Sequence, residues 1–247
     1  MNEPVKAEID YFKRRAEGAQ RLEYGKFIPF KVMFKMGAPT CVTIPWLSFD
    51  GLIAYLLLLD VLKEDYFITP KKLDLTPYLP KDMLTLPLKR SGKVYHTSVS
   101  QFEPSTLRVD TIYKRFEERW TENTKQKKIR IGSGHYRAYM MKQPYICAKT
   151  VMFYACGCID TIEKLIRSHI YALGNDTRIG YGAVRDILFE PTEEDWSLVK
   201  GGVAMRPIPA EMCSEYEEAA YLAYKPPYWS PRSVALCVPP EARCKLK

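Results

Sequence analysis

The chain has 247 residues, enough for one large domain or two small ones. Its 37 lysines and arginines outnumber the 29 aspartates and glutamates, and the resulting formal charge of +8 favours a polyanionic partner such as nucleic acid. The N-terminal residues carry charges without an apolar run, and the longest apolar run, 52–59, is far shorter than a membrane span. These features argue against a signal peptide and a transmembrane helix, so we expect a cytoplasmic protein with no membrane partner.

Seven cysteines are scattered along the chain, and none of them forms a Cys-x-x-Cys pair. An odd number with irregular spacing is typical of reduced thiols in a cytosol. Cys156 and Cys158 would share one face of a strand, as core residues rather than metal ligands, because a zinc site needs further ligands at suitable spacing. We therefore expect neither a metal nor a cofactor.

The first part of the chain predicts a short basic helix over 10–21 and a strand over 26–36. Phe30, Val32 and Phe34 alternate in that strand, and Pro29 indicates an edge position or a late strand start. Ser48 or Asp50 can cap a helix that runs to about Lys63. Apolar residues lie almost all round this helix, which predicts deep burial.

The middle of the chain is harder to assign. Prolines punctuate residues 70–87, which excludes a long helix or a central strand there. We predict a strand over 94–102, either a helix or a strand over 110–120, an exposed tip over 121–128, and a strand over 128–141.

The last part of the core predicts a β-prone run over 145–157, a helix from Asp160 through Ile170, and a strand over 183–189. The order strand, helix, long insertion, strand, helix, strand indicates a split β-α-β sheet. Eight of the 18 prolines follow in the tail from Pro191, which predicts an extended segment that wraps the domain or a partner.

Positive charge is concentrated in residues 111–142, which contain nine lysines and arginines and only three glutamates. Tyrosine, phenylalanine and tryptophan residues are interleaved with these charges. Basic groups neutralise phosphates and aromatic rings stack on exposed bases, so this pattern favours nucleic-acid binding. A solvated surface insertion with aromatic residues packed beneath it accounts for the segment equally well.

Residues 174–182, with the sequence Gly-Asn-Asp-Thr-Arg-Ile-Gly-Tyr-Gly, lie between the second helix and the last strand. A phosphate loop or a dinucleotide fingerprint would follow a strand and open a helix, so the reversed order here excludes both. Backbone amides at Gly180 and Gly182, the Arg178 guanidinium and the Tyr181 ring suit contact with a polyanion. As an alternative, Gly174 ends the helix, and Gly180 and Gly182 form a tight turn into the strand.

Histidines offer little support for catalysis. His135 has an ordinary pKa range suited to a general base, but no partner for it is identifiable in the sequence. His96 and His169 are equally isolated, and His169 is expected on the polar face of the second helix. We favour an ordinary surface role for His135.

The helix, the 174–182 loop and the following strand resemble the glycine-rich loop of the RAMP proteins of CRISPR systems. Residues 47–55 at the start of the first helix, 153–160 between strand and helix, and 205–209 in the tail also fit. More closely, residues 26–210 resemble the type IV subunit of the Cas-five-like group. The Asn175-Asp176 pair departs from that family, in which more basic residues are common at this point.

The resemblance implies an α+β fold: a ferredoxin-like (RRM-like) RAMP core, an inserted basic thumb and a proline-rich C-terminal extension. The core would occupy residues 1–190 with the thumb at about 66–142, and residues 191–247 would form the extended segment. Carried onto this sequence, Arg178, Gly180, Tyr181 and Gly182 would contact RNA. The thumb would supply further RNA contacts through a set of basic residues, namely Lys114, Arg115, Lys125, Lys127, Lys128, Arg130 and Arg137, and an exposed basic pair, Lys89 and Arg90, would add to them. Arg206 would either brace the loop or bind RNA.

The implied function is non-catalytic: the subunit would bind the 5′ handle of the crRNA in a type IV effector ribonucleoprotein of antiviral defence. Its partners would be crRNA, the Cas-seven-like backbone subunits, a large or Cas-eight-like subunit, and in addition target DNA. A metal-independent endoribonuclease that matures crRNA through His135, Tyr136 or a nearby lysine is the alternative. A phosphate-ligand enzyme that uses the glycine loop is a third reading.

Overall fold

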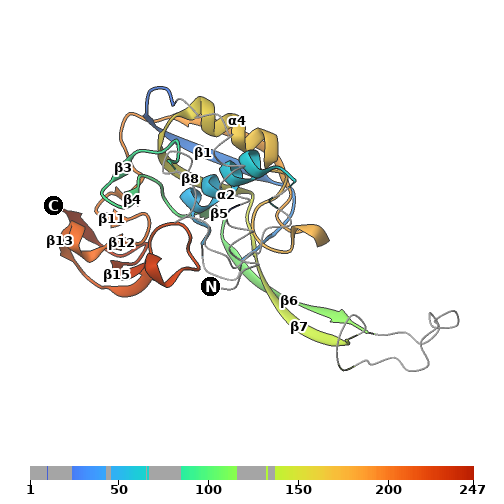
Figure 1. The fold of residues 1–247 in the computed structure, drawn as a ribbon. Helices are drawn as coiled ribbons and strands as arrows, with labels where there is room; N and C mark the ends of the chain where they lie inside the picture. The colour runs from blue at the N-terminus through green and yellow to red at the C-terminus, as the bar shows by residue number, and fades with distance from the viewer. Residues whose placement is uncertain are drawn as a thin grey trace, which may run out of the picture.

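The computed structural model describes residues 10, 24–42, 46–64, 66, 85–115, 132 and 137–247. Its central sheet has four strands in the order β5 (Gln101–Glu103), β8 (Thr150–Gly157), β1 (Ile28–Met36) and β9 (Val184–Pro191). Every neighbouring pair in this sheet is antiparallel. The described part of the chain is thus mostly β-structure, with two helices, α2 and α4, against the sheet (Figure 1).

Strand β1 is the centre of this sheet because its alternating aromatic and aliphatic residues form one apolar face. Phe30, Val32 and Phe34 are fully buried, as the sequence predicts. The edge position indicated by Pro29 is wrong, since β1 pairs with β8 on one side and β9 on the other. The late-start alternative explains the proline, because pairing with β9 begins only at Phe30.

Helices α2 (Phe49–Leu62) and α4 (Ile159–His169) pack on the Phe30 face of the sheet. The predicted start of α2 is confirmed, since Ser48 is its N-cap residue. In α4 the N-cap residue is Cys158, and Asp160, the expected cap, lies in the first turn. In α2 the inward residues Phe49, Ile53 and Leu56 are fully buried, and Tyr55 is exposed. In α4 only one stripe is buried, which leaves the charged face to solvent.

A second sheet carries a long hairpin away from the core. It has the order β2 (Thr40–Cys41), β7 (Tyr139–Cys147) and β6 (Thr106–Lys114). The β6–β7 pair, inserted between β5 and β8, projects into solvent (Figure 1). The ambiguous region 110–120 is therefore strand as far as Lys114, and the predicted tip at 121–128 lies outside the described residues.

The predicted strand 94–102 is broken into short pieces. A small hairpin joins β3 (Arg90–Ser91) to β4 (Val94–Tyr95), and isolated bridges at Thr97 and Val99 lead to β5. The chain here crosses between the core and the C-terminal region, so it bonds to neighbours on several sides. Tyr154, Met205 and Leu47 each supply a carbonyl acceptor for one of its amides.

Residues 191–247 are folded rather than extended, which corrects the expectation from their proline content. They form small antiparallel sheets with a separate hydrophobic cluster that includes Leu198, Ile208, Cys237 and Val238. The strands are β10 (Val199–Lys200), β11 (Val203–Ala204), β12 (Ile208–Pro209), β13 (Cys213–Tyr216), β14 (Ala220–Ala223), β15 (Val234–Val238) and β16 (Cys244–Leu246). Prolines lie at strand ends and in turns, where a missing N–H costs little.

All seven cysteines are free thiols, and six of them are buried. Cys156 lies in β8, but Cys158 is the N-cap residue of α4, so the two do not share one strand face as expected. Within the described ranges no group of three or more His, Cys, Asp or Glu side chains is arranged to hold a metal ion. The described helices include none that is both long and apolar enough to cross a membrane.

Candidate nucleic-acid interface

The glycine loop, residues 174–182, contains a single 3-10 turn, η3 (Thr177–Ile179), on the protein surface. Left-handed residues bracket the turn: Asp176 has φ 55°, Gly180 φ 102° and Gly182 φ 70°. Residues 175–180 are exposed, and Arg178 lies at the centre of this crest. The loop therefore presents one guanidinium on a short, sharply turned support.

Two of its glycines are required by close backbone contacts. A Cβ at Gly182 would lie 1.8 Å from the Leu173 carbonyl oxygen, and one at Gly174 would lie 2.4 Å from the Cys41 carbonyl oxygen. Gly174 does not end the helix as expected, because α4 stops at His169. Gly180 has open space around it, so only its positive φ favours glycine there.

The backbone amides proposed for phosphate binding are already bonded within the chain. The Gly182 amide donates to the Pro39 carbonyl at 2.7 Å, and the Gly180 amide donates to the Thr177 carbonyl at 3.1 Å. These two glycines consequently shape the loop, and the polar group that it offers to a ligand is the side chain of Arg178. The Tyr181 ring is half-buried and packs on Tyr145 at a centroid distance of 5.7 Å.

Strand β2 joins the glycine loop to the base of the β6–β7 hairpin. The Cys41 carbonyl accepts the Asn175 amide at 2.8 Å, and the Cys41 thiol donates to the Asp176 carboxylate at 3.6 Å. The Gln143 side chain in β7 donates to the same sulfur. Burial raises the pKa of the Cys41 thiol, which keeps it a neutral donor. The loop and the hairpin root are thus one connected surface.

The hairpin has two chemically different faces because neighbouring residues along a strand point to opposite sides. Leu107, Val109, Tyr113 and Met140 share one face, and each is 59–70% exposed; Lys142, opposite Thr111, lies on the same face. Arg108, Asp110 and Lys114 lie on the other face with Ile112, Tyr139 and Met141, and Arg108 is directly opposite Tyr145. Since Tyr145 packs on Tyr181, this polar face continues onto the glycine loop.

Sequence reasoning overlooked Arg108 because it precedes the basic segment 111–142. Alternation in the strand carries the signal that would have found it, since Arg108 and Lys114 are an even number of residues apart. Of the predicted thumb residues, Lys114, Arg115 and Arg137 are exposed at the outer end of the described hairpin. The others, namely Lys125, Lys127, Lys128 and Arg130, lie outside the described residues, as does His135.

Lys89 and Arg90 are exposed as expected, but they do not join the glycine loop. They belong to the β3–β4 hairpin, which lies beside the C-terminal strands, away from the projecting β6–β7 pair (Figure 1). The structure therefore divides the predicted site residues between two places. One is the glycine loop with the polar hairpin face, and the other is the β3–β4 hairpin.

Arg206 is a core residue, which corrects both expectations for it. Its side chain is 1% exposed and pairs with Asp50 in the first turn of α2 at 3.0 Å. It also donates to the Thr97 hydroxyl at 2.7 Å and to the Tyr95 carbonyl at 2.8 Å. An arginine enclosed in this way neither reaches the glycine loop nor offers a donor to RNA.

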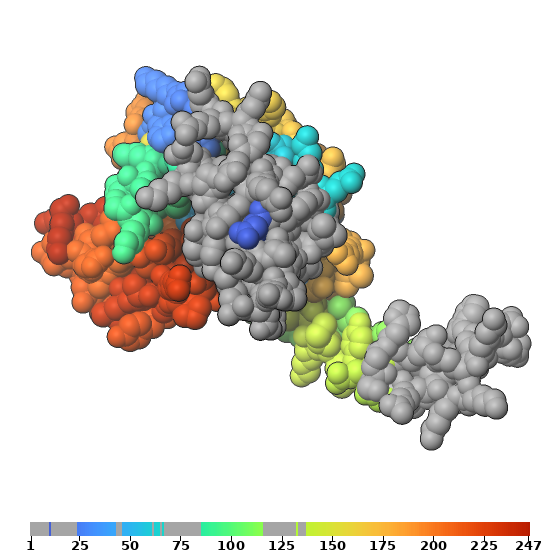
Figure 2. Space-filling view, viewed as in Figure 1, coloured from blue at the N-terminus to red at the C-terminus, as the bar shows by residue number. Residues whose placement is uncertain are grey.

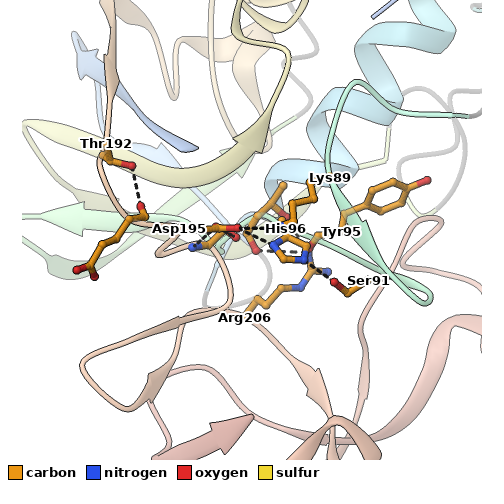
Figure 3. Close-up of polar contacts among 10 residues, drawn as sticks. Lys89, Ser91, Tyr95, His96, Thr192, Asp195 and Arg206 are labelled. Carbon is orange, nitrogen blue, oxygen red and sulfur yellow. Dashed lines mark hydrogen bonds and ion pairs between the residues drawn. The ribbon is translucent and has the colours of Figure 1, made fainter. Parts of the chain in front are cut away.

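His96 is not isolated, contrary to the expectation. Its Nε2 lies 2.7 Å from the Ser91 hydroxyl, and its Nδ1 lies 2.7 Å from Asp195 Oδ2 (Figure 3). Burial of Asp195 opposes its charge, but hydrogen bonds from His96 and Ser197 hold the pKa of this carboxyl well below its usual range. His169 likewise has a partner, Asp60, at 3.2 Å. The sequence held no local signal for these pairs, because Asp195 and Asp60 are distant in the chain.

Comparison with known proteins identifies the class of this protein. The family model of the CRISPR type IV associated protein Csf3 matches residues 83–240, which include the β3–β4 hairpin, β6, β7, the glycine loop and most of the C-terminal strands. The chain therefore belongs to the Csf3 family of CRISPR type IV associated proteins. No curated protein sequence matches it.

A search of solved structures finds a chain of the type III-B Cmr-beta complex, solved by cryo-EM bound to cognate target RNA. The alignment has 12% sequence identity and a TM-score of 0.39, and it covers 76% of this chain and 67% of the other.

Proposed function

We propose that the protein is a non-catalytic crRNA-binding subunit of a type IV CRISPR effector complex, equivalent to the Cas-five-like RAMP group. In this proposal it caps the 5′ handle of the crRNA and contacts the adjacent Cas-seven-like backbone subunit in the cytoplasm. Membership of a type IV CRISPR-associated family supports the setting. The large or Cas-eight-like subunit and target DNA are further proposed partners.

The proposed core is ferredoxin-like, with two domains divided at about residue 190. The sheet order supports this: helices follow the first and third core strands, and the second and fourth strands occupy the two edges. The β6–β7 hairpin, inserted between the second and third core strands, is the proposed thumb. Its exposed apolar face, which includes Leu107, Val109 and Met140, suits a protein neighbour, and its polar face suits RNA.

One observation carries the proposal: Tyr145 and Tyr181 join the polar hairpin face to the glycine loop. Arg108 is opposite Tyr145 in the hairpin and Arg178 belongs to the same loop as Tyr181, so this ring contact links the segments that carry the two arginines, which are 70 residues apart in the chain. Guanidinium groups bind phosphate oxygens through two parallel hydrogen bonds, which suits a surface that tracks an RNA backbone. The polar hairpin face then extends that track away from the core.

A binding role is proposed in preference to endoribonuclease activity because neither the glycine loop nor the described part of the β6–β7 hairpin contains a histidine. His96 and His169 lie in other parts of the fold, where they contact Asp195 and Asp60. A general base must be within reach of the proton that it abstracts. The endoribonuclease alternative depends on His135, and incubation of a repeat RNA with purified protein and with His135→Ala tests it directly.

The test of the proposal is binding of a repeat-derived RNA with an intact 5′ handle. We expect Arg178→Ala to weaken this RNA about tenfold, as loss of a charge-assisted phosphate contact would. Arg243→Ala removes another exposed arginine, from the C-terminal region, and serves as the matched control. We also expect an RNA that lacks the handle to bind wild-type protein and Arg178→Ala alike. Equal affinity of wild type and Arg178→Ala for the handle RNA would overturn the proposal.

A further inference from the structure

The β3–β4 hairpin carries a second group of cations at the junction with the C-terminal strands. Arg90 and Lys93 lie on either side of Gly92, which has φ 60° in the two-residue turn. Figure 2 shows this hairpin, in green, directly against the orange and red C-terminal region. Val94 and Tyr224, the chain neighbours of Lys93 and Lys225, belong to one hydrophobic cluster, and the two lysines are near enough for their charges to interact. Two lysines from separate segments therefore lie close together, and Arg90 belongs to the same hairpin as Lys93.

Hydrogen bonds to the core and to the C-terminal region fix the position of the β3–β4 hairpin. The Ser91 side chain and the His96 ring are 2.7 Å apart, and the other ring nitrogen bonds to Asp195 (Figure 3). The Lys89 amide donates to Cys156 in β8, and the Tyr95 carbonyl accepts from buried Arg206. Such support fixes where the hairpin presents its cations, which lowers the entropy that a ligand must remove.

The cations of this surface are not neutralised within the protein. Lys89 pairs with Asp195 at 3.5 Å, but in the described ranges no carboxylate lies within ion-pair distance of Arg90, Lys93 or Lys225. Partial burial and repulsion from Lys93 lower the pKa of Lys225. Two lysines that repel each other across a tertiary contact are an unfavourable arrangement for the free protein. A bound anion between them removes that repulsion.

We propose that Arg90, Lys93 and Lys225 form a second nucleic-acid site, which binds the phosphodiester backbone of a strand other than the one at the glycine loop. A backbone repeats its charge along its length, so it matches cations contributed by separate segments. Trp229, four residues after Lys225 and 54% exposed, adds an aromatic surface to the same loop. The site is separate from the glycine loop and does not depend on the function proposed above.

The test uses full-length protein saturated with unlabelled handle RNA, or free protein if no handle RNA binds. Labelled duplex DNA, single-stranded DNA and single-stranded RNA are then titrated in parallel over a range of salt concentrations. We expect at least one of these nucleic acids to bind. The one that binds most tightly identifies the kind of strand that the site recognises. Lys93→Ala with Lys225→Ala should weaken that ligand about tenfold at low salt, since two phosphate contacts are lost. The slope of log affinity against log salt should also be smaller for this double variant than for wild type.

The control double variant, Lys245→Ala with Lys247→Ala, removes the same charge from the end of the chain and should bind like wild type. Lys93→Gln alone, with an unchanged melting temperature, should give an intermediate loss. The proposal is overturned if none of the three nucleic acids binds, or if both double variants lose the same affinity. Arg178→Ala should leave this site intact, so failure here is distinguishable from failure at the glycine loop.

Discussion

Single residues of the glycine loop differ sharply in what they contribute. Gly174 and Gly182 are required because neighbouring carbonyl oxygens occupy the space of a side chain, whereas Gly180 is surrounded by solvent. Arg178 is the exposed charged side chain at the crest, and Tyr181 is half-buried against Tyr145. Gly174, Gly182 and Tyr181 thus determine the conformation of the loop, and Arg178 is the residue available to contact a ligand.

This difference predicts the stability of two alanine variants. Gly182→Ala should lower the free energy of unfolding by more than about 2 kcal/mol, because the new Cβ meets backbone that cannot move aside. Gly180→Ala should cost only about 1 kcal/mol, from its positive φ alone. Urea unfolding of the two variants measures both values. Equal losses would contradict the assigned role of Gly182.

The Asp195 carboxylate makes the free energy of unfolding depend on pH in the acid range. Because its pKa is depressed in the folded state, Asp195 stabilises the protein above the ordinary carboxyl pKa of 3.8, and this contribution is lost as the pH falls below that value. We expect Asp195→Asn to be less stable than wild type at pH 6 and to lose less stability between pH 5 and pH 3. Melting temperatures across that range check the sign. A parallel decline in both proteins would refute it.

Among the elements, the β6–β7 hairpin has two faces to which we assign different proposed contacts. The pairing register places Arg108 and Lys114 on one side and Leu107, Val109 and Tyr113 on the other. Beyond the short β2 pairing at its root, the hairpin exposes Leu107, Val109 and Tyr113, and an exposed apolar face of this kind fits the protein contact proposed above. The hairpin therefore suits contact with RNA on one side and protein on the other.

Substitutions on the two faces should separate these roles. Arg108→Ala should reduce the slope of log affinity against log salt for the handle RNA by about 0.7, the value for one lost phosphate contact on a single strand. Val109→Ser, next to it on the opposite face, should leave that slope unchanged. Fluorescence anisotropy at four salt concentrations measures both. If Val109→Ser lowers the slope as much as Arg108→Ala, the division of the faces is wrong.

At the scale of the whole molecule, one buried polar cluster joins the core to the C-terminal strands. Arg206 pairs with Asp50 of α2, and the Tyr228 hydroxyl donates to the other Asp50 oxygen at 2.6 Å. Burial and the nearby Asp50 carboxylate raise the pKa of Tyr228, which keeps it a neutral donor. Both charges of the pair are enclosed, so each depends on the other for compensation.

Removal of either charge should therefore destabilise the molecule strongly. We expect Arg206→Met to lower the free energy of unfolding by about 3–5 kcal/mol, because the buried Asp50 charge is left without an opposite charge. Arg206→Met combined with Asp50→Asn should lose less than the sum of the two single variants. Urea unfolding of the four proteins measures this coupling. Strict additivity would show that the pair does not act as a unit.

The sequence by itself determined strands β1, β8 and β9 and both core helices, because apolar periodicity is a local signal. It also indicated the glycine loop and the basic insertion. Only the tertiary structure decided that Arg206 is buried, that His96 has partners, and that Lys89 and Arg90 lie away from Arg178. The proline-rich tail proved to be folded for the same reason. Each of these outcomes depends on contacts between residues distant in the chain, and such contacts leave no mark in local spacing or composition.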